Sequence, residues 1–270
     1  MAFSFPSQIV SYAYPEQHDI QLQNCYNSFF NRNIDIRVVE ISRSALKYKL
    51  LIIPGVALID NATAEKIREF VKNGGTAIMS GYSALVDSNN QVFAITHPGK
   101  LNDVFGIRIA GFEETESMNE LSKEFFQGDK LHILYKDKNL FVQSPRFDII
   151  QPQGAEVIGN IISLDKNYPI ITSNKYGKGR AIYLGLPVRC EILNPILDEL
   201  VNNLAIKKGP DVPDGVLSRF IDNKRILYLN LSKEPKVIEL KGNSRSILLE
   251  KDYIDKFIIQ PFEPEFVELK

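Results

Sequence analysis

The sequence contains no tryptophan, only two cysteines and only three histidines among its 270 residues. Cys25 and Cys190 form no CxxC pair, so we expect reduced thiols rather than a disulfide framework. His18, His97 and His132 show no HExxH or other metal-ligand spacing, and we expect neither a metal site nor a cofactor. The lack of tryptophan removes the aromatic side chain most used for stacking on sugars, although 11 tyrosines and 16 phenylalanines could replace it.

A strong charge of one sign and a long apolar run are also missing. The 32 basic and 33 acidic side chains nearly cancel, so no nucleic-acid or membrane-surface partner is expected. No apolar run approaches the roughly 20 residues that span a bilayer. The N-terminus has no basic segment followed by an apolar core, so no signal peptide is predicted. The chain is expected to be soluble, and cytoplasmic if Met1 is its natural start.

Residues 48–86 predict a complete βαβ unit. Residues 50–53 (LLII) form a continuous apolar run, as in a parallel strand that is covered on both faces. Asn61 is the predicted N-cap of the following helix, and Gly74 is predicted to end it in the left-handed conformation. The helix has one apolar face at helical spacing, made of Ala64, Ile67, Phe70 and Val71. Residues 76–79 (TAIM) are the second predicted strand.

The segments around this unit alternate between strand and helix. Strands are expected at 8–13, 34–39, 107–109, 131–135, 140–142, 155–158, 170–173 and 181–184, and helices at 19–31, 98–105 and 191–204. This alternation predicts a doubly wound, mainly parallel sheet of the flavodoxin or class I amidotransferase type.

The last part of the chain has a different pattern. Prolines and glycines in residues 207–215 mark a linker, which places a domain boundary between an α/β domain, residues 1–209, and a small β domain, residues 210–270. Six short strand candidates follow and predict an antiparallel β-sandwich. In sequence they read GVLSRFI, RILYLNL, KVIEL, SILLE, KFIIQ and EFVEL.

The turn after residues 76–79 is the first place to look for catalysis, because enzymes of similar architecture place a nucleophile on such a turn. Here it carries Ser80 and Ser83 and no cysteine. The pattern is not G-x-S-x-G, since Met79 and Tyr82 stand where small residues are needed, and no His-x-Glu or His-x-Asp dyad follows late in the chain. A turn without catalytic function is the better interpretation, and an esterase-like or amidotransferase-like hydrolase using either serine is an alternative.

Two further segments have a functional and a structural interpretation. Residues 174–180 (NKYGKGR) could cradle a phosphate, but they lack GxxxxGK[ST], and a hairpin with glycines at positive φ explains them better. An acidic stretch follows residue 112 and could hold a metal or a sugar. Its members are Glu113, Glu114, Glu116, Glu120 and Glu124, and a solvated loop or helix face is the far more common explanation of such a stretch.

Several segments in order resemble the C-terminal half of the glycoside hydrolase family 42 β-galactosidases. They are residues 48–93, residues 97–114 (HPGKLNDVFGIRIAGFEE), GAEVIG at 154–159, ITSNKYGKGRAIYLGLP at 171–187, and the tail from RILYLNLSKEP to IIQPFEPEFVEL. The resemblance implies the family's amidotransferase-like trimerisation domain and its C-terminal β domain. It leaves no room for the catalytic (β/α)8 barrel, whose glutamates therefore have no counterparts here.

The resemblance implies a non-catalytic assembly module, with no catalytic residue of its own. Its expected partners are further copies of itself, as a homotrimer, or a barrel-bearing glycosidase. A carbohydrate-binding module that holds galactosides without cleaving them is the other alternative.

Overall fold

The computed structural model describes residues 2–3, 15–39, 47–86, 98–114, 126–127, 130–144, 146–163 and 167–270. The chain divides into two compact units, one of Met1–Tyr26 with Arg37–Glu199 and one of Asn27–Ile36 with Leu200–Lys270. The boundary predicted between residues 209 and 210 stays a prediction. Within the described ranges, none of the helices has the length and apolar character that a membrane crossing requires.

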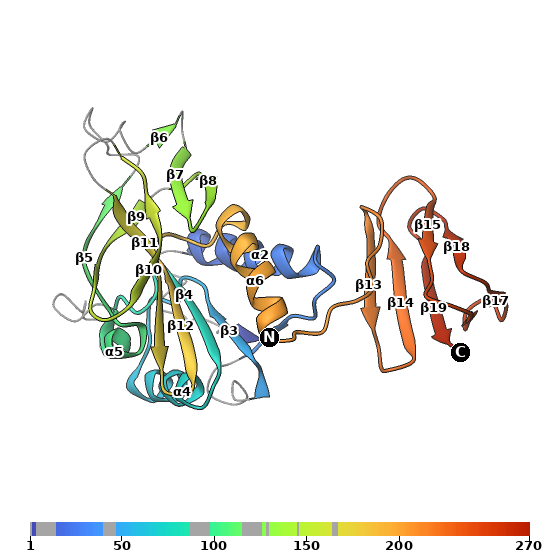
Figure 1. The fold of residues 1–270 in the computed structure, drawn as a ribbon, viewed down its shortest axis with the longest axis horizontal. Helices are drawn as coiled ribbons and strands as arrows, with labels where there is room; N and C mark the ends of the chain where they lie inside the picture. Colours follow the sequence, from blue (N-terminus) through green and yellow to red (C-terminus); the bar gives the residue numbers. More distant parts are fainter. Residues whose placement is uncertain are drawn as a thin grey trace. The chain divides into compact units, whose positions relative to one another are not determined.

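The larger unit is built on a ten-stranded mixed sheet (Figure 1). Its strands are β1 (Ala2–Phe3), β2 (Arg37–Val38), β3 (Leu50–Ile53), β4 (Thr76–Ser80), β6 (Phe126–Gln127), β7 (Lys130–Tyr135), β8 (Lys138–Val142), β10 (Glu156–Ile161), β11 (Tyr168–Tyr176) and β12 (Gly179–Leu184). They lie in the order β2-β1-β3-β4-β12-β11-β10-β7-β6, and β8 pairs with β7.

Only half of this sheet is parallel. The pairs that join β2, β1, β3, β4 and β12 are parallel, whereas those from β12 to β6 and β8 are antiparallel. The predicted mainly parallel sheet is therefore correct for the first half and wrong for the second. Short hairpins join β7 to β8 and β11 to β12, and connections of that length permit only antiparallel pairing.

The helices of the larger unit are α2 (Pro15–Phe30), α4 (Asn61–Lys72), the 3-10 turn η2 (Gly99–Leu101), α5 (Asn102–Phe105) and α6 (Cys190–Asn203), which runs on into the second unit. A separate antiparallel ribbon pairs β5 (Ile107–Glu114) with β9 (Arg146–Pro152). The strand predicted at residues 8–13 lies outside the described residues. The strand β9 was not predicted at all.

The ends of α4 follow helix-capping rules. Asp60, with extended backbone, is the N-cap, and its carboxylate accepts a 2.7 Å hydrogen bond from the backbone N–H of Thr63. The prediction of Asn61 as the cap is wrong by one residue, because Asn61 already belongs to the helix. Gly74 has a φ of 111° and the N–H of Gly75 donates to the carbonyl of Phe70, which together close the helix as predicted.

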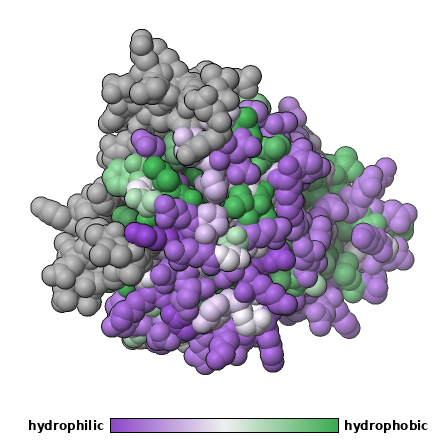
Figure 2. Space-filling view, turned by 60° about the vertical axis from the view of Figure 1, so that its left-hand side comes forward, coloured by the Kyte–Doolittle hydropathy of each residue, from purple (hydrophilic) through white to green (hydrophobic). Residues whose placement is uncertain are grey.

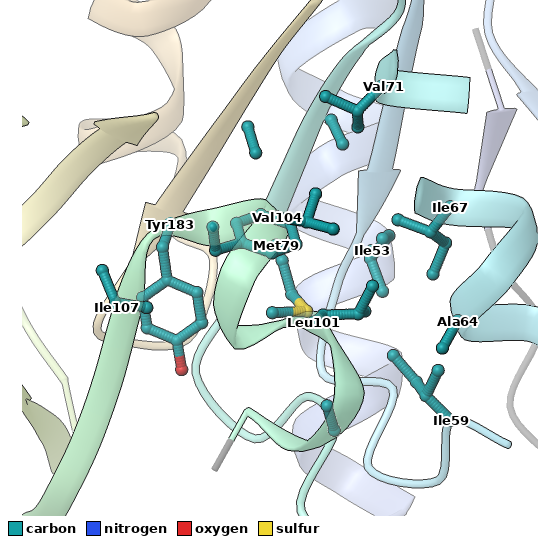
Figure 3. Close-up of a cluster of buried hydrophobic side chains, with 14 of the residues drawn as sticks. Ile53, Ile59, Ala64, Ile67, Val71, Met79, Leu101, Val104, Ile107 and Tyr183 are labelled. Atoms are coloured by element: carbon teal, nitrogen blue, oxygen red, sulfur yellow. The ribbon is translucent and has the colours of Figure 1, made fainter. Parts of the chain in front are cut away.

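A buried apolar cluster joins α4 to one face of the sheet. Ile53, Met79 and Tyr183 come from three neighbouring parallel strands and pack with the apolar face of α4 and with the α5 segment (Figure 3). The alternate side chains of β3, Leu50 and Ile52, point to the opposite face and are also fully buried. Both faces of the parallel strands are therefore covered, which agrees with the unbroken apolar run.

The smaller unit contains two antiparallel sheets around one core. Five strands form one sheet in the order β13 (Val216–Phe220), β14 (Arg225–Asn230), β19 (Pro264–Leu269), β16 (Ser244–Ser246) and β17 (Asp252–Tyr253). The second sheet pairs β15 (Lys236–Glu239) with β18 (Lys256–Ile259). Side chains from both sheets share the core, among them Tyr228, Ile238, Phe257 and Val267.

Two predicted strands, residues 246–250 and residues 34–39, are longer than the strands that the structure has there. Of the strand predicted at residues 246–250, only Ser246 lies in β16, and residues 247–249 form a turn. The Ser246 hydroxyl accepts from the N–H of Leu249, and the Ser246 N–H donates to the carbonyl of Lys251. Of residues 34–39, only Arg37 and Val38 join the large sheet, since Ile34 instead forms an isolated bridge with Lys208.

Candidate functional site

The turn that follows β4 is tight and conformationally unusual. Tyr82 and Ala84 both have positive φ, 68° and 53°, a backbone conformation that residues other than glycine seldom adopt. The N–H of Gly81 donates to the carbonyl of Leu184 at 2.8 Å, and a Cβ at Gly81 would lie 3.1 Å from the backbone of Leu186. This is the turn that carries the two candidate nucleophiles of the sequence, Ser80 and Ser83.

The hydroxyl of Ser80 is buried and fully engaged. It donates to Oε1 of Gln21 at 2.6 Å and accepts the backbone N–H of Gly55 at 3.0 Å. The same Gln21 oxygen accepts the N–H of Val188 at 2.9 Å. Ser80 therefore links α2, the turn after β3 and the segment before α6.

Ser83 has a similar structural position. Its hydroxyl donates to the carbonyl of Ile53 and accepts the N–H of Val56, both at 3.1 Å, which fastens the turn to the end of β3. His18 lies nearby, but its Nδ1 contacts the carbonyl of Pro54 at 2.9 Å. Neither serine is hydrogen-bonded to a histidine in the part of the chain that the structure describes. The arrangement favours the non-catalytic interpretation of this turn.

A buried charged network lies beside the same turn. The Arg146 guanidinium donates to Asp148 at 2.6 Å, and the other Asp148 oxygen accepts the hydroxyl of Tyr183 at 2.7 Å. Burial raises the pKa of Tyr183 well above its ordinary value, and the neighbouring Asp148 carboxylate raises it further. The Tyr183 hydroxyl therefore stays protonated and serves as a donor.

Aromatic rings enclose the guanidinium of this network. The Arg146 Cζ atom lies 4.3 Å from the ring centroid of Tyr82 and 4.0 Å from that of Phe112. Tyr82 is buried, whereas Phe112 on β5 is half exposed. A stack of three planar groups therefore runs from the turn to the surface. Sequence reasoning missed it because Arg146 and Asp148 are charged residues in a strand that was not predicted.

The segment 174–180 forms the predicted hairpin between β11 and β12. Gly177 has a φ of 59°, and the N–H of Lys178 donates to the carbonyl of Lys72 at 2.9 Å. A Cβ at Gly179 would lie 2.2 Å from the carbonyl oxygen of Val71, so only glycine fits against the end of α4. The hairpin glycines thus serve packing.

Among the described residues, the structure does not bring together the acidic side chains considered for metal binding. Glu113 and Glu114 lie on β5, while Glu116, Glu120 and Glu124 fall outside the described residues. No group of three or more His, Cys, Asp or Glu side chains suited to a metal occurs among the described residues.

The two cysteines are free thiols. Burial raises the pKa of Cys25 well above its ordinary value, and the nearby charge of Cys190 adds to the shift. The Cys190 sulfur lies 3.5 Å from the carbonyl oxygen of Asn24, where α6 begins beside α2. The expected reduced thiols agree with this placement.

Large apolar side chains are exposed on both units, and such surface often marks an interaction site when it is contiguous. On the larger unit they are Ile20, Tyr26, Val38, Phe112 and Phe141; on the smaller unit they are Ile221, Leu231, Val237, Ile247, Leu248, Leu249, Ile254, Ile258 and Phe262. Figure 2 shows hydrophobic surface interrupting a mostly hydrophilic face of the protein.

Comparison with known proteins gives consistent results. The family described as "Beta-galactosidase trimerisation domain" matches residues 8–209. Beta-galactosidase Pbg of Clostridium perfringens is 28% identical over 257 residues, which cover 92% of this chain and 36% of that protein. Beta-galactosidase BgaB of a Geobacillus species is 30% identical over 176 residues, or 65% of this chain and 25% of that protein. The chain thus spans about a third or less of the length of these relatives.

The fold is also found among solved structures. The crystal structure of a β-galactosidase from Bacillus circulans sp. alkalophilus superposes with a TM-score of 0.83 at 20% identity, and the match covers 100% of this chain and 41% of that one. The β-galactosidase of Halorubrum lacusprofundi gives a TM-score of 0.81 at 16% identity.

Proposed function

Because the chain belongs to the family of β-galactosidase trimerisation domains, we propose that it is a non-catalytic assembly module that forms a homotrimer. The resemblance to the glycoside hydrolase family 42 enzymes, predicted from the ordered segments, is confirmed by the family match and by the relatives. The observation that carries the proposal is the match over residues 8–209, which includes the whole of the large sheet except β1 and ends beyond α6.

The proposed partners follow from how much of the relatives the chain covers. Since 92% of this chain matches only 36% of the C. perfringens enzyme, most of that enzyme has no counterpart in this sequence. We propose that the catalytic barrel of such enzymes lies in the unmatched part. The module would then bring barrel-bearing copies or partners together and would contribute no catalytic residue itself.

The turn after β4 supports a structural role for this chain. The hydroxyls of Ser80 and Ser83 are held by backbone groups and by Gln21. A nucleophile needs a hydroxyl that is free to attack and a base in contact with it. The proposed role uses the turn as a joint between strands.

The finer description of the fold is also part of the proposal. We propose that the parallel half of the sheet, with its buried faces, is doubly wound in the class I amidotransferase manner. The assembly domain would comprise residues 1–209, and residues 210–270 would form a small antiparallel sandwich. Unfolding of the whole chain in urea tests the boundary when hydrogen exchange is measured separately for peptides from residues 1–209 and from residues 210–270. Two domains give two unfolding transitions, one in each set of peptides.

Light scattering of the purified chain, combined with a hydrolysis assay, tests the function. We expect a trimer at micromolar concentration and no turnover of a chromogenic β-galactoside. A chain that stays monomeric, alone and when mixed with a barrel-bearing β-galactosidase, would contradict the proposal. Turnover of a chromogenic ester that is lost in Ser80→Ala would favour the hydrolase alternative instead.

A further inference from the structure

The stack of Tyr82, Arg146 and Phe112 has one exposed end. Tyr82 and Arg146 are buried at 9% and 5% exposure, whereas half of the Phe112 side chain is accessible. Phe112 pairs with Asp148 across the β5–β9 ribbon, so Arg146, two residues before Asp148, is its diagonal neighbour on the same face. The ribbon therefore exposes the ring of Phe112, and the buried Arg146 and Tyr82 behind it form the support of this ring.

The support keeps the ring in place. A guanidinium is attracted to the face of an aromatic ring, and Arg146 makes two such contacts. The hydrogen bond to Asp148, and that from Tyr183 to Asp148, fix the guanidinium in turn. A side chain that is already ordered loses less conformational entropy when a partner covers it.

Stability alone does not account for this network. A buried ion pair is often no more stable than apolar residues of similar volume, because removing two charges from water costs much of their attraction. The backbone of Tyr82, with a φ of 68°, carries a further conformational cost, because a residue with a Cβ seldom adopts positive φ. In this conformation the Tyr82 ring lies against Arg146, with 4.3 Å between the ring centroid and Cζ.

Aromatic residues and arginine are the side chains most enriched where protein interfaces are strongest. All members of the stack lie within residues 8–209, the part that matches the trimerisation family. β5 lies at the left of Figure 1, on the side that comes forward in Figure 2.

We infer that Phe112, held by Arg146 and Tyr82, is an anchor of the contact between two copies of this chain. This inference rests on the proposed homotrimer and names the residue through which one copy holds the next. In a threefold assembly the ring contacts a different surface of the neighbouring copy, so each subunit gives one anchor and receives one.

Sedimentation equilibrium of the full chain and its Phe112 variants tests the inference. Phe112→Ala is expected to raise the dissociation constant of the assembly by at least about thirtyfold, as the loss of a central aromatic anchor does. Phe112→Tyr keeps the ring and is expected to assemble like the unchanged protein. Phe141→Ala is the matched control, because Phe141 is also an exposed phenylalanine, stacked on His132 of the β7–β8 hairpin.

The outcomes separate the two proposals. If the trimers of the unchanged chain and of Phe112→Ala have the same dissociation constant, the inference is overturned, while the proposed assembly function still holds. A monomer in the unchanged chain overturns both. Calorimetric binding of galactose that is lost in Phe112→Ala, with unchanged assembly, would identify the ring as a sugar platform and contradict the contact proposed here. Circular dichroism of each variant confirms that the fold is retained.

Discussion

Replacing Asp148 by asparagine removes the charge that balances Arg146 without changing the shape of the side chain. Both groups are buried, at 1% and 5% exposure, so the guanidinium cannot recover its lost partner from water. Removing one partner of a buried ion pair destabilises by about 3–5 kcal/mol. We therefore expect Asp148→Asn to lower the free energy of unfolding of the larger unit by about 3 kcal/mol.

Hydrogen exchange of backbone amides measures this change within the larger unit alone. Because every 1.4 kcal/mol is a factor of ten, exchange of the slowest amides in β9 and β12 should become about a hundred times faster. The control is Asp103→Asn, which removes one of the two carboxylate partners of Arg68 in a more exposed ion pair; the other is Glu65. An exposed pair contributes about 0–1 kcal/mol, so exchange should change by less than about fivefold there.

A third variant separates charge from packing. Replacing Arg146 by methionine, Asp148 by leucine and Tyr183 by phenylalanine removes the whole network and leaves no buried charge unpaired. We expect its stability to return to within about 1 kcal/mol of the unchanged protein. The reasoning is refuted if Asp148→Asn accelerates exchange no more than Asp103→Asn does.

Three further predictions concern packing, capping and reactivity. Gly179→Ala should prevent close packing of the hairpin on α4 and lower the melting temperature strongly, whereas Gly111→Ala, whose Cβ meets no atom within 4 Å, should leave it nearly unchanged. Asp60→Ala should cost about 1 kcal/mol in urea unfolding at neutral pH, and Asp60→Asn much less. Hydrogen bonds from Thr63 lower the pKa of Asp60 in the folded protein. The stabilisation that Asp60 contributes is therefore complete above the unfolded pKa of about 3.9 and is lost as pH falls through the lower, folded pKa. The Asp60→Asn variant should lack this acid dependence. In the native protein a thiol reagent at pH 8 should modify Cys190 and spare buried Cys25 until urea exposes it; rapid labelling of both contradicts the placement.

The sequence predicted the βαβ unit well because several local signals agreed there. The apolar run of β3, the four-residue face of α4 and the glycines after it each indicate the same elements. The core cluster contains Leu51 and Ile53 of β3 and the whole apolar face of α4. The position of the cap was off by one because Asp60 and Asn61 are both good capping residues. Only the extended backbone of Asp60 decides between them.

The β9 strand and the network on it could not be predicted in the same way. Arg146 and Asp148 interrupt the apolar pattern. Because charged residues are typical of solvent-exposed loops, a buried ion pair cannot be distinguished from such a loop by sequence. Its partners Tyr82 and Tyr183 are more than 30 residues away along the chain. The hydrogen bonding of Ser80 likewise depends on Gln21, 59 residues earlier. The sequence therefore indicated the turn and its non-catalytic interpretation, but not the hydrogen bonds that hold the serine.

The proposed function requires this chain to associate into a trimer through its own surface. Native mass spectrometry of the purified protein at micromolar concentration tests it most directly. We expect a principal species of three times the chain mass of 30.6 kDa. A single species at the mass of one chain, unchanged up to the highest soluble concentration and in the presence of a barrel-bearing β-galactosidase, would contradict it.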